Sequence, residues 1–124
     1  MKAFLICPVR GADPAVSRRY VEQLEASGWT VHWPHRDTEQ ADPDGLAICQ
    51  QNRAAIVAAD HVFIIWDGRS TGCLFDMGMA FALGKPVTIL DAPPPDVPPG
   101  KSFLRMIRAW GASSQEKEDP PWPI

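Results

Sequence analysis

An acidic residue, Asp76, stands among apolar residues in the segment STGCLFDMGMAF, residues 70–81. Glycine, serine and threonine precede it and interrupt the chain after a strongly apolar run at residues 61–66. A carboxylate in this position either complements the N-terminus of a helix, where the helix dipole favours negative charge, or faces a ligand. The residues alone leave both alternatives open.

A second group of residues has the chemistry of an anion site. Arg10 and Gly11 lie in the segment CPVRGAD, and Ser70, Thr71 and Gly72 stand at the expected start of a helix. Free backbone N–H groups at a helix start favour a phosphate or a carboxylate. The alternative is an ordinary capped helix and a solvated arginine, because neither segment matches a P-loop or a G-x-G-x-x-G fingerprint. The sequence therefore indicates no cofactor.

Strand-like and helix-like segments alternate along the chain and must position these residues. Apolar runs predict strands, and amphipathic or alanine-rich stretches predict helices between them. This order requires right-handed crossovers and predicts a flavodoxin-like three-layer α/β/α fold with a parallel sheet of four to five strands. In such sheets, ligands bind outside the carboxyl ends of the strands. The expected strands are residues 3–6, 29–33, 61–66 and 86–90, and the expected helices are residues 13–28, 45–59, 72–83 and 101–110.

The length of 124 residues fits one domain, which we place at residues 1–112. The polar segment 34–45 is predicted to be a surface loop, and the proline-rich segment 92–100 an extended linker. Residues 113–124 are polar and rich in proline, so we expect a flexible C-terminal tail.

Composition excludes several classes of function. The net charge of −3 offers no basic excess for binding a nucleic-acid duplex. No stretch approaches the ~20 apolar residues that span a membrane, and the N-terminus has no secretory signal. Three separated cysteines, Cys7, Cys49 and Cys73, argue against a disulfide framework and for a reducing cytoplasm.

The run STGCLFDMGMAFALGKPV, residues 70–87, resembles the signature of the nucleoside 2-deoxyribosyltransferase superfamily. In that signature a glycine precedes a nucleophilic glutamate, which is followed by x-G-x-A and a short G-K-P turn into a strand. The closer likeness is to the branch of 2'-deoxynucleoside 5'-phosphate N-hydrolases. It rests on VRG near the start, ADHVFII, the serine six residues before the acidic position, and MIRA near the end. The resemblance covers residues 3 to 110.

The resemblance implies an N-glycosidase or a deoxyribosyltransferase acting on a nucleoside or a nucleoside 5'-monophosphate. Asp76 takes the place of the glutamate nucleophile. Members of the superfamily complete their sites from a neighbouring subunit, which implies a homodimer or a higher homo-oligomer. The implied substrate-binding residues, which hold sugar, phosphate or base, are Pro8, Arg10, Gly11, Ser70, Thr71, Gly72 and Met79.

Two positions depart from the family pattern. Asp76 is one methylene shorter than glutamate, and Asn52 stands where the family carries an aspartate eight residues before the aspartate that precedes the third strand, here Asp60. An amide does not act as a carboxylic acid at neutral pH. Asn52 is therefore predicted to position the ligand through hydrogen bonds. The alternatives are a nucleotide-binding or sensor module that keeps the pocket without the chemistry, and a scaffold without a small ligand.

Other residues have two interpretations each. His32, His35 and Asp37 either hold a metal or line a loop rim, and no third ligand has diagnostic spacing, so we predict no metal. Cys73 is either a reactive thiol or a packing residue. Trp33 and Trp66 either stack on a base or belong to the core. An apolar stripe is predicted to pack on the sheet or across a dimer interface and consists of Phe103, Leu104, Met106, Ile107 and Trp110.

Overall fold

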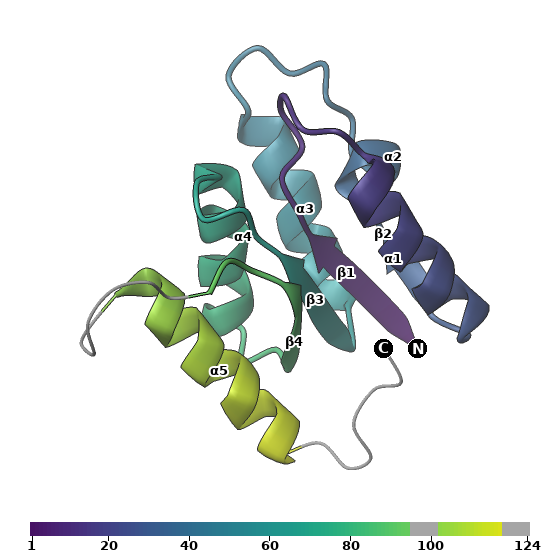
Figure 1. Cartoon of the computed structure of the whole chain (residues 1–124). Helices are drawn as coiled ribbons and strands as arrows, with labels where there is room; N and C mark the ends of the chain where they lie inside the picture. Colours follow the sequence, from purple (N-terminus) through teal and green to yellow (C-terminus); the bar gives the residue numbers. More distant parts are fainter. Residues whose placement is uncertain (95–101, 118–124) are drawn as a thin grey trace.

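The structure, a computed structural model, describes residues 1–94 and 102–117 (Figure 1). Strands and helices alternate along the chain, except that two helices, α2 and α3, separate β2 from β3. The elements are β1 (Lys2–Ile6), α1 (Ala15–Ala26), β2 (Thr30–His32), α2 (Pro34–Asp37), α3 (Leu46–Ala58), β3 (His61–Ile65), α4 (Thr71–Ala82), β4 (Val87–Asp91) and α5 (Phe103–Lys117).

The strands form one parallel sheet in the order β2-β1-β3-β4. The central strands β1 and β3 are aligned so that Ala3 pairs with His61 and Ile6 with Ile64. Helices flank the sheet, which confirms the predicted α/β flavodoxin-like fold, with four strands in the described residues (Figure 1).

Two cores lie on opposite faces of the sheet, because successive side chains of a strand point to opposite faces. Phe4, Ile6, Val62 and Ile64 face α3, α4 and α5, whereas Leu5 belongs to the core beneath α1. The side chains of these five residues are fully buried. Fully burying an apolar side chain of this size contributes about 1.5–3 kcal/mol, so these strands anchor the fold.

The segment 34–45, predicted as a loop, contains the short helix α2. Pro34 occupies its first position, where the missing N–H removes no hydrogen bond. Asp37 Oδ2 accepts a hydrogen bond of 2.8 Å from the Trp33 N–H and closes the turn. The loop prediction is therefore wrong for these four residues.

Other boundaries differ from the predictions by a few residues. α1 begins at Ala15 with Pro14 as its N-cap, while Asp13 Oδ1 accepts a hydrogen bond of 3.0 Å from the Ala15 N–H. α5 continues to Lys117, beyond the predicted end of that helix, and so includes the first five residues of the segment expected to be a tail. Residues 95–101 of the predicted linker and last helix, and residues 118–124 of the tail, lie outside the described residues.

The apolar stripe of α5 divides between the sheet and the surface. Ile107 is fully buried in the core, and Leu104 and Trp110 pack against it half-buried. Phe103 and Met106 are 65% and 43% exposed. Across the part of the chain that the structure describes, no helix has the length and apolar character to cross a membrane.

Candidate functional site

The carboxyl ends of β1 and β3 are where a ligand site is expected. These neighbouring strands end side by side, and the chain continues from β1 to α1 in one layer and from β3 to α4 in the other. In an open parallel sheet, a crevice forms at the carboxyl ends of strands that diverge in this way. The segments 7–14 and 66–70 follow the ends of these two strands.

Asp76 lies in the second turn of α4 and is only 8% exposed. The cap of this helix is Ser70, whose Oγ accepts a hydrogen bond of 3.2 Å from the Cys73 N–H. The interpretation of Asp76 as a residue of the helix start is therefore wrong. Its Oδ2 instead accepts a hydrogen bond of 3.4 Å from Nδ2 of Asn52 on α3. The structure thus brings together the two positions that depart from the family pattern.

Burial raises the pKa of Asp76 to about 7, and the hydrogen bond from Asn52 opposes this rise. Removing a carboxylate from water disfavours its charged form, whereas an N–H donor favours it. The two effects place the ionisation of Asp76 much closer to neutral pH than that of an ordinary aspartate.

The charge of Asp76 acts on three cysteines that are far apart in the sequence. Burial raises the pKa of Cys7 and of Cys73 to about 12, and the negative charge of Asp76 acts in the same direction. Burial and then Asp76 also raise the pKa of Cys49. All three thiols are free. Cys73 packs in the core, so its thiol stays protonated at neutral pH.

The residues predicted to contact a phosphate after β1 lie at the surface. Arg10 and Gly11 are exposed, and Gly11 has a φ of +70°, a conformation that glycine adopts without strain. Pro8 is half-buried, and its carbonyl oxygen accepts a hydrogen bond of 3.0 Å from His35 Nε2. His35 therefore ties the end of β1 to α2.

The segment after β3 is fixed by its own hydrogen bonds. Asp67 Oδ1 accepts from the Arg69 N–H at 2.9 Å and from the Ser70 N–H at 2.8 Å. Thr71 and Gly72 are exposed, Ser70 is half-buried, and Met79 packs half-buried against the core.

Trp33 and Trp66 both belong to the core and not to an open stacking surface. They are 5% and 6% exposed. Trp33 Nε1 donates to Ser17 Oγ at 3.1 Å, and Trp66 Nε1 donates to the carbonyl oxygen of Ser70 at 3.1 Å.

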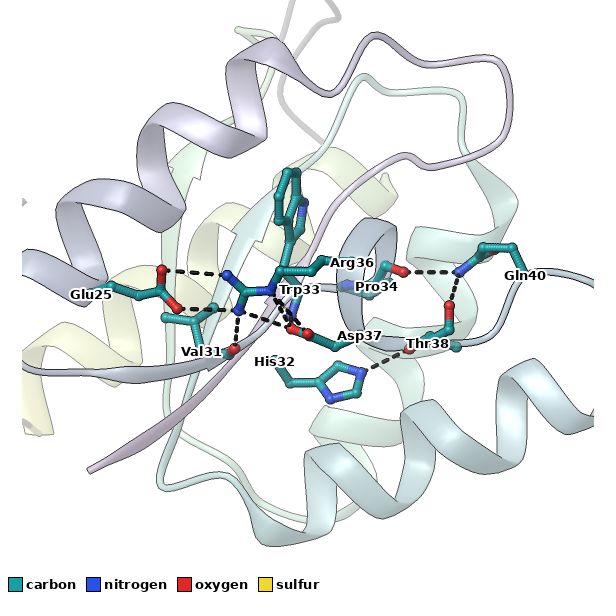
Figure 2. A network of polar contacts seen from close by, with 9 residues as sticks. All are labelled: Glu25, Val31, His32, Trp33, Pro34, Arg36, Asp37, Thr38 and Gln40. Carbon is teal, nitrogen blue, oxygen red and sulfur yellow. Dashed lines mark hydrogen bonds and ion pairs between the residues drawn. The ribbon is translucent and has the colours of Figure 1, made fainter.

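A chain of side-chain hydrogen bonds that sequence reasoning missed continues from Asn52 to β2. Thr38 Oγ1 donates to Asn52 Oδ1 at 2.8 Å. Figure 2 shows the next link, in which His32 Nε2 lies 2.7 Å from Thr38 Oγ1. Thr38 and Asn52 are 4% and 5% exposed. No spacing rule links positions 32, 38, 52 and 76, because the fold alone brings them together. Within residues 1–94 and 102–117, no group of three or more His, Cys, Asp or Glu side chains has the arrangement of a metal site.

Two hollows in the structure lie away from Asp76. One of about 550 Å³ separates α4 from α5, and its lining includes Phe75, Phe81 and Trp110. One of about 600 Å³ lies beside α1 near Arg18 and Arg36. Asp76 lines neither of these hollows, so its carboxylate faces α3 and not the α4–α5 groove.

The family model for nucleoside 2-deoxyribosyltransferase matches residues 4–113. The chain belongs to this family. The match extends from β1 into α5 and so includes every strand of the sheet. In the search of curated proteins, no sequence matches the chain.

Two solved structures have the same fold as this nucleoside 2-deoxyribosyltransferase family member. The 2-deoxyribosyltransferase of Bacillus psychrosaccharolyticus superposes with a TM-score of 0.64 at 22% sequence identity, over 93% of this chain and 91% of that one. The CMP N-glycosidase BcmB of Clostridium botulinum superposes with a TM-score of 0.57 at 23% identity, over 90% of this chain and 81% of that one.

Proposed function

We propose that this protein cleaves or transfers the N-glycosidic bond of a nucleoside or a nucleoside 5'-monophosphate, with Asp76 as the nucleophile. The observation that carries the proposal is the buried Asp76 carboxylate, which accepts a hydrogen bond from Asn52. The sequence resemblance assigns this residue to the place of the family's nucleophile. The names of the two structural neighbours, a 2-deoxyribosyltransferase and a CMP N-glycosidase, support this reaction class.

The reaction has two steps. In the first, an oxygen of Asp76 attacks the anomeric carbon, and the electron pair of the C–N bond leaves with the base, which takes up a proton. In the second, water or another base attacks the same carbon and releases Asp76. Because the Asn52 amide is not an acid, the proton for the leaving base comes from solvent.

The short side chain of Asp76 lowers the expected rate. An oxygen that falls short of the anomeric carbon by an ångström costs about 100-fold in rate. The ionised form is the nucleophile, and burial raises the pKa of Asp76 to about 7. The rate should therefore rise as the pH increases through this value.

The proposed substrate class follows the 5'-phosphate N-hydrolase branch of the superfamily. Arg10 and Gly11 would contact a 5'-phosphate from one side of the crevice, and Ser70, Thr71 and Gly72 would do so from the other, with Pro8 and Met79 closer to sugar and base. The exposure of Arg10, Gly11, Thr71 and Gly72 leaves these groups accessible to a ligand.

We also propose that the protein is a cytoplasmic homodimer or higher homo-oligomer whose interface includes the α4–α5 groove. Phe75, Phe81 and Phe103 at this groove are 57%, 60% and 65% exposed. An apolar patch of this kind marks an interaction site, and burial of aromatic side chains dominates interface energetics.

The test is release of free base from a panel of nucleosides and nucleoside 5'-monophosphates, measured by chromatography. Wild type should release base from at least one of them, Asp76→Ala should not, and Asp76→Glu should be faster by up to about 100-fold. Glu22→Gln, which removes an exposed carboxylate on α1, is the matched control and should behave as wild type. Equal rates for wild type and Asp76→Ala would refute Asp76 as the nucleophile.

A second candidate function is a nucleotide-binding or sensor module without chemistry. The pairing of Asp76 with the amide of Asn52 favours it, because Asp76 is shorter than the family's glutamate and the Asn52 amide is not an acid. Calorimetric binding of a nucleotide with no base release from any member of the panel would support this candidate. Absence of both binding and release would support a scaffold role.

A further inference from the structure

The hydrogen-bonded chain that reaches Asp76 begins at the edge of the sheet. It runs from His32 at the end of β2, through Thr38 after α2 and Asn52 on α3, to Asp76 on α4. The three donor–acceptor distances are 2.7, 2.8 and 3.4 Å. The chain thus connects β2, the residue after α2 and α3 to one carboxylate on α4.

The direction of each hydrogen bond follows from the single proton of the Thr38 hydroxyl. That proton goes to Asn52 Oδ1, so Thr38 Oγ1 can only accept from His32 Nε2. Burial lowers the pKa of His32, and the charges of Asp37 and Arg36 oppose each other, so the ring is neutral near pH 7 and carries its N–H on Nε2. With its oxygen held by Thr38, the Asn52 amide presents Nδ2 to Asp76.

We infer that Thr38, supported by His32, is a positioning residue that orients the Asn52 amide so that it donates to Asp76. This inference rests on the proposed function only for its consequence in catalysis. An N–H donor stabilises a charged carboxylate more than a protonated one, whereas a reversed Asn52 amide would turn its acceptor oxygen toward Asp76. The observed direction therefore favours the ionised carboxylate, the form that attacks.

The backbone around Thr38 is held in place by other side chains (Figure 2). Gln40 Nε2 donates to the carbonyl oxygens of Pro34 and Thr38 at 3.0 and 3.1 Å. The Glu39 N–H donates to Gln51 Oε1 at 3.0 Å and so ties this segment to α3. The Thr38 hydroxyl thus keeps its position relative to Asn52.

Arg36 fixes α2 to the neighbouring strand and helix (Figure 2). Its guanidinium donates to the carbonyl oxygen of Val31 at 2.9 Å, to Glu25 Oε2 at 3.1 Å and to Asp37 Oδ1 at 2.9 Å. A positioned second layer of this kind is how proteins hold a reacting group within the narrow range that chemistry needs.

The test is titration of the Asp76 carboxyl carbon by NMR, a readout that requires no activity. Asn52 donates to Asp76, and the charge of Asp76 acts on the thiols of Cys7, Cys49 and Cys73; the variants leave all four residues unchanged. Thr38→Val, which keeps the shape and removes the hydroxyl, should raise the midpoint by about 0.5–1 pH unit, a 3- to 10-fold change in the acid dissociation constant. Thr38→Ser, which keeps the hydroxyl, should restore the wild-type midpoint.

Two further variants separate orientation from packing. Thr88→Val removes the hydroxyl from another His–Thr pair, in which Thr88 Oγ1 lies 2.8 Å from His61 Nε2, and should leave the Asp76 midpoint unchanged. His32→Gln keeps an N–H donor, so its Asp76 midpoint should stay close to that of wild type. An unchanged midpoint in Thr38→Val, or equal shifts in Thr38→Val and Thr38→Ser, would overturn the inference.

The base-release assay distinguishes this inference from the proposed function. A shifted midpoint in Thr38→Val without base release by wild type would retain the positioning role and remove the glycosidase. Base release by wild type with an unshifted midpoint in Thr38→Val would do the reverse. If wild type releases base and Thr38→Val shifts the Asp76 midpoint, Thr38→Val should also move the acidic limb of the pH–rate profile to higher pH. Thr38→Ser should return that limb to its wild-type position.

Discussion

Replacing Asp76 with asparagine should stabilise the protein, and the gain should grow with pH. In the folded protein, burial raises the pKa of Asp76 from its ordinary value of 3.8 to about 7. Between these pH values the folded state binds more protons at this site than the unfolded state does. Stability is therefore lost as the pH rises from about 4 to about 7.

The magnitude follows from the size of the pKa change. A rise of about three pH units corresponds to about 4 kcal/mol at 1.36 kcal/mol per unit. The advantage of Asp76→Asn should increase by about 4 kcal/mol between pH 4 and pH 8, with about half of this reached near pH 5.5. Asparagine cannot ionise, and its amide can still hydrogen-bond to Asn52, so the variant escapes the penalty.

Urea unfolding of both proteins at a series of pH values measures this difference. Only the pH dependence of the difference in unfolding free energy is diagnostic, because a difference that is the same at every pH reports a change in packing. Asp37→Asn is the control of opposite sign: burial raises the pKa of Asp37, but hydrogen bonds from Arg36 and the Trp33 N–H outweigh it and lower the pKa. Its carboxylate should stabilise the wild type more as the pH rises through the acidic range. A difference curve for Asp76→Asn that stays flat between pH 4 and pH 8 would refute the reasoning.

The remaining predictions concern packing, capping and assembly. A Cβ on Gly111 would lie 2.9 Å from Ile89 Cδ1, whereas a Cβ on Gly78 would have no atom within 4 Å, so Gly111→Ala should be less stable than Gly78→Ala by about 1–3 kcal/mol in urea unfolding. Ser70→Ala removes the N-cap of α4 and should lower the unfolding free energy by about 1 kcal/mol, with Ser70→Asp retaining it. Phe103→Glu should convert the proposed dimer to a monomer in sedimentation velocity without lowering the melting temperature, and an unchanged sedimentation coefficient would count against the proposed interface.

The sequence could predict the strands and most helices, because their signals are local. The apolar run at residues 61–65 forms a strand buried on both faces, and Gly84, with a φ of +66°, follows the end of α4. The short α2 was missed because polar residues dominate its surroundings. Its signal was the proline at the first helical position followed by Asp37. The length of α5 was missed because polar residues 113–117 gave no apolar signal for a helix.

The candidate site was only partly predictable. A motif in the sequence singled out Asp76, but its burial and its contact with Asn52 depend on how α3 packs against α4. Thr38 carries no signal in the sequence, and His32 stands out only as a possible metal ligand or loop-rim residue. Their role depends on the Thr38 hydroxyl meeting an amide from another element. Contacts between residues this far apart in the sequence depend on the topology of the fold.

The unequal covering of the sheet bears on how the molecule opens. α1 packs on one core, whereas α3, α4 and α5 contribute to the other. The three-residue β2 is at the sheet edge, so its amides and those of α1 should exchange with deuterium through a local opening, before those of β1 and β3. Asp76 and Asn52 belong to the slowly exchanging part, whereas Thr38 and His32 follow the outer strand. Each local opening would break the hydrogen bond between the Asn52 amide and the Thr38 hydroxyl, while the Asp76 carboxylate stays buried.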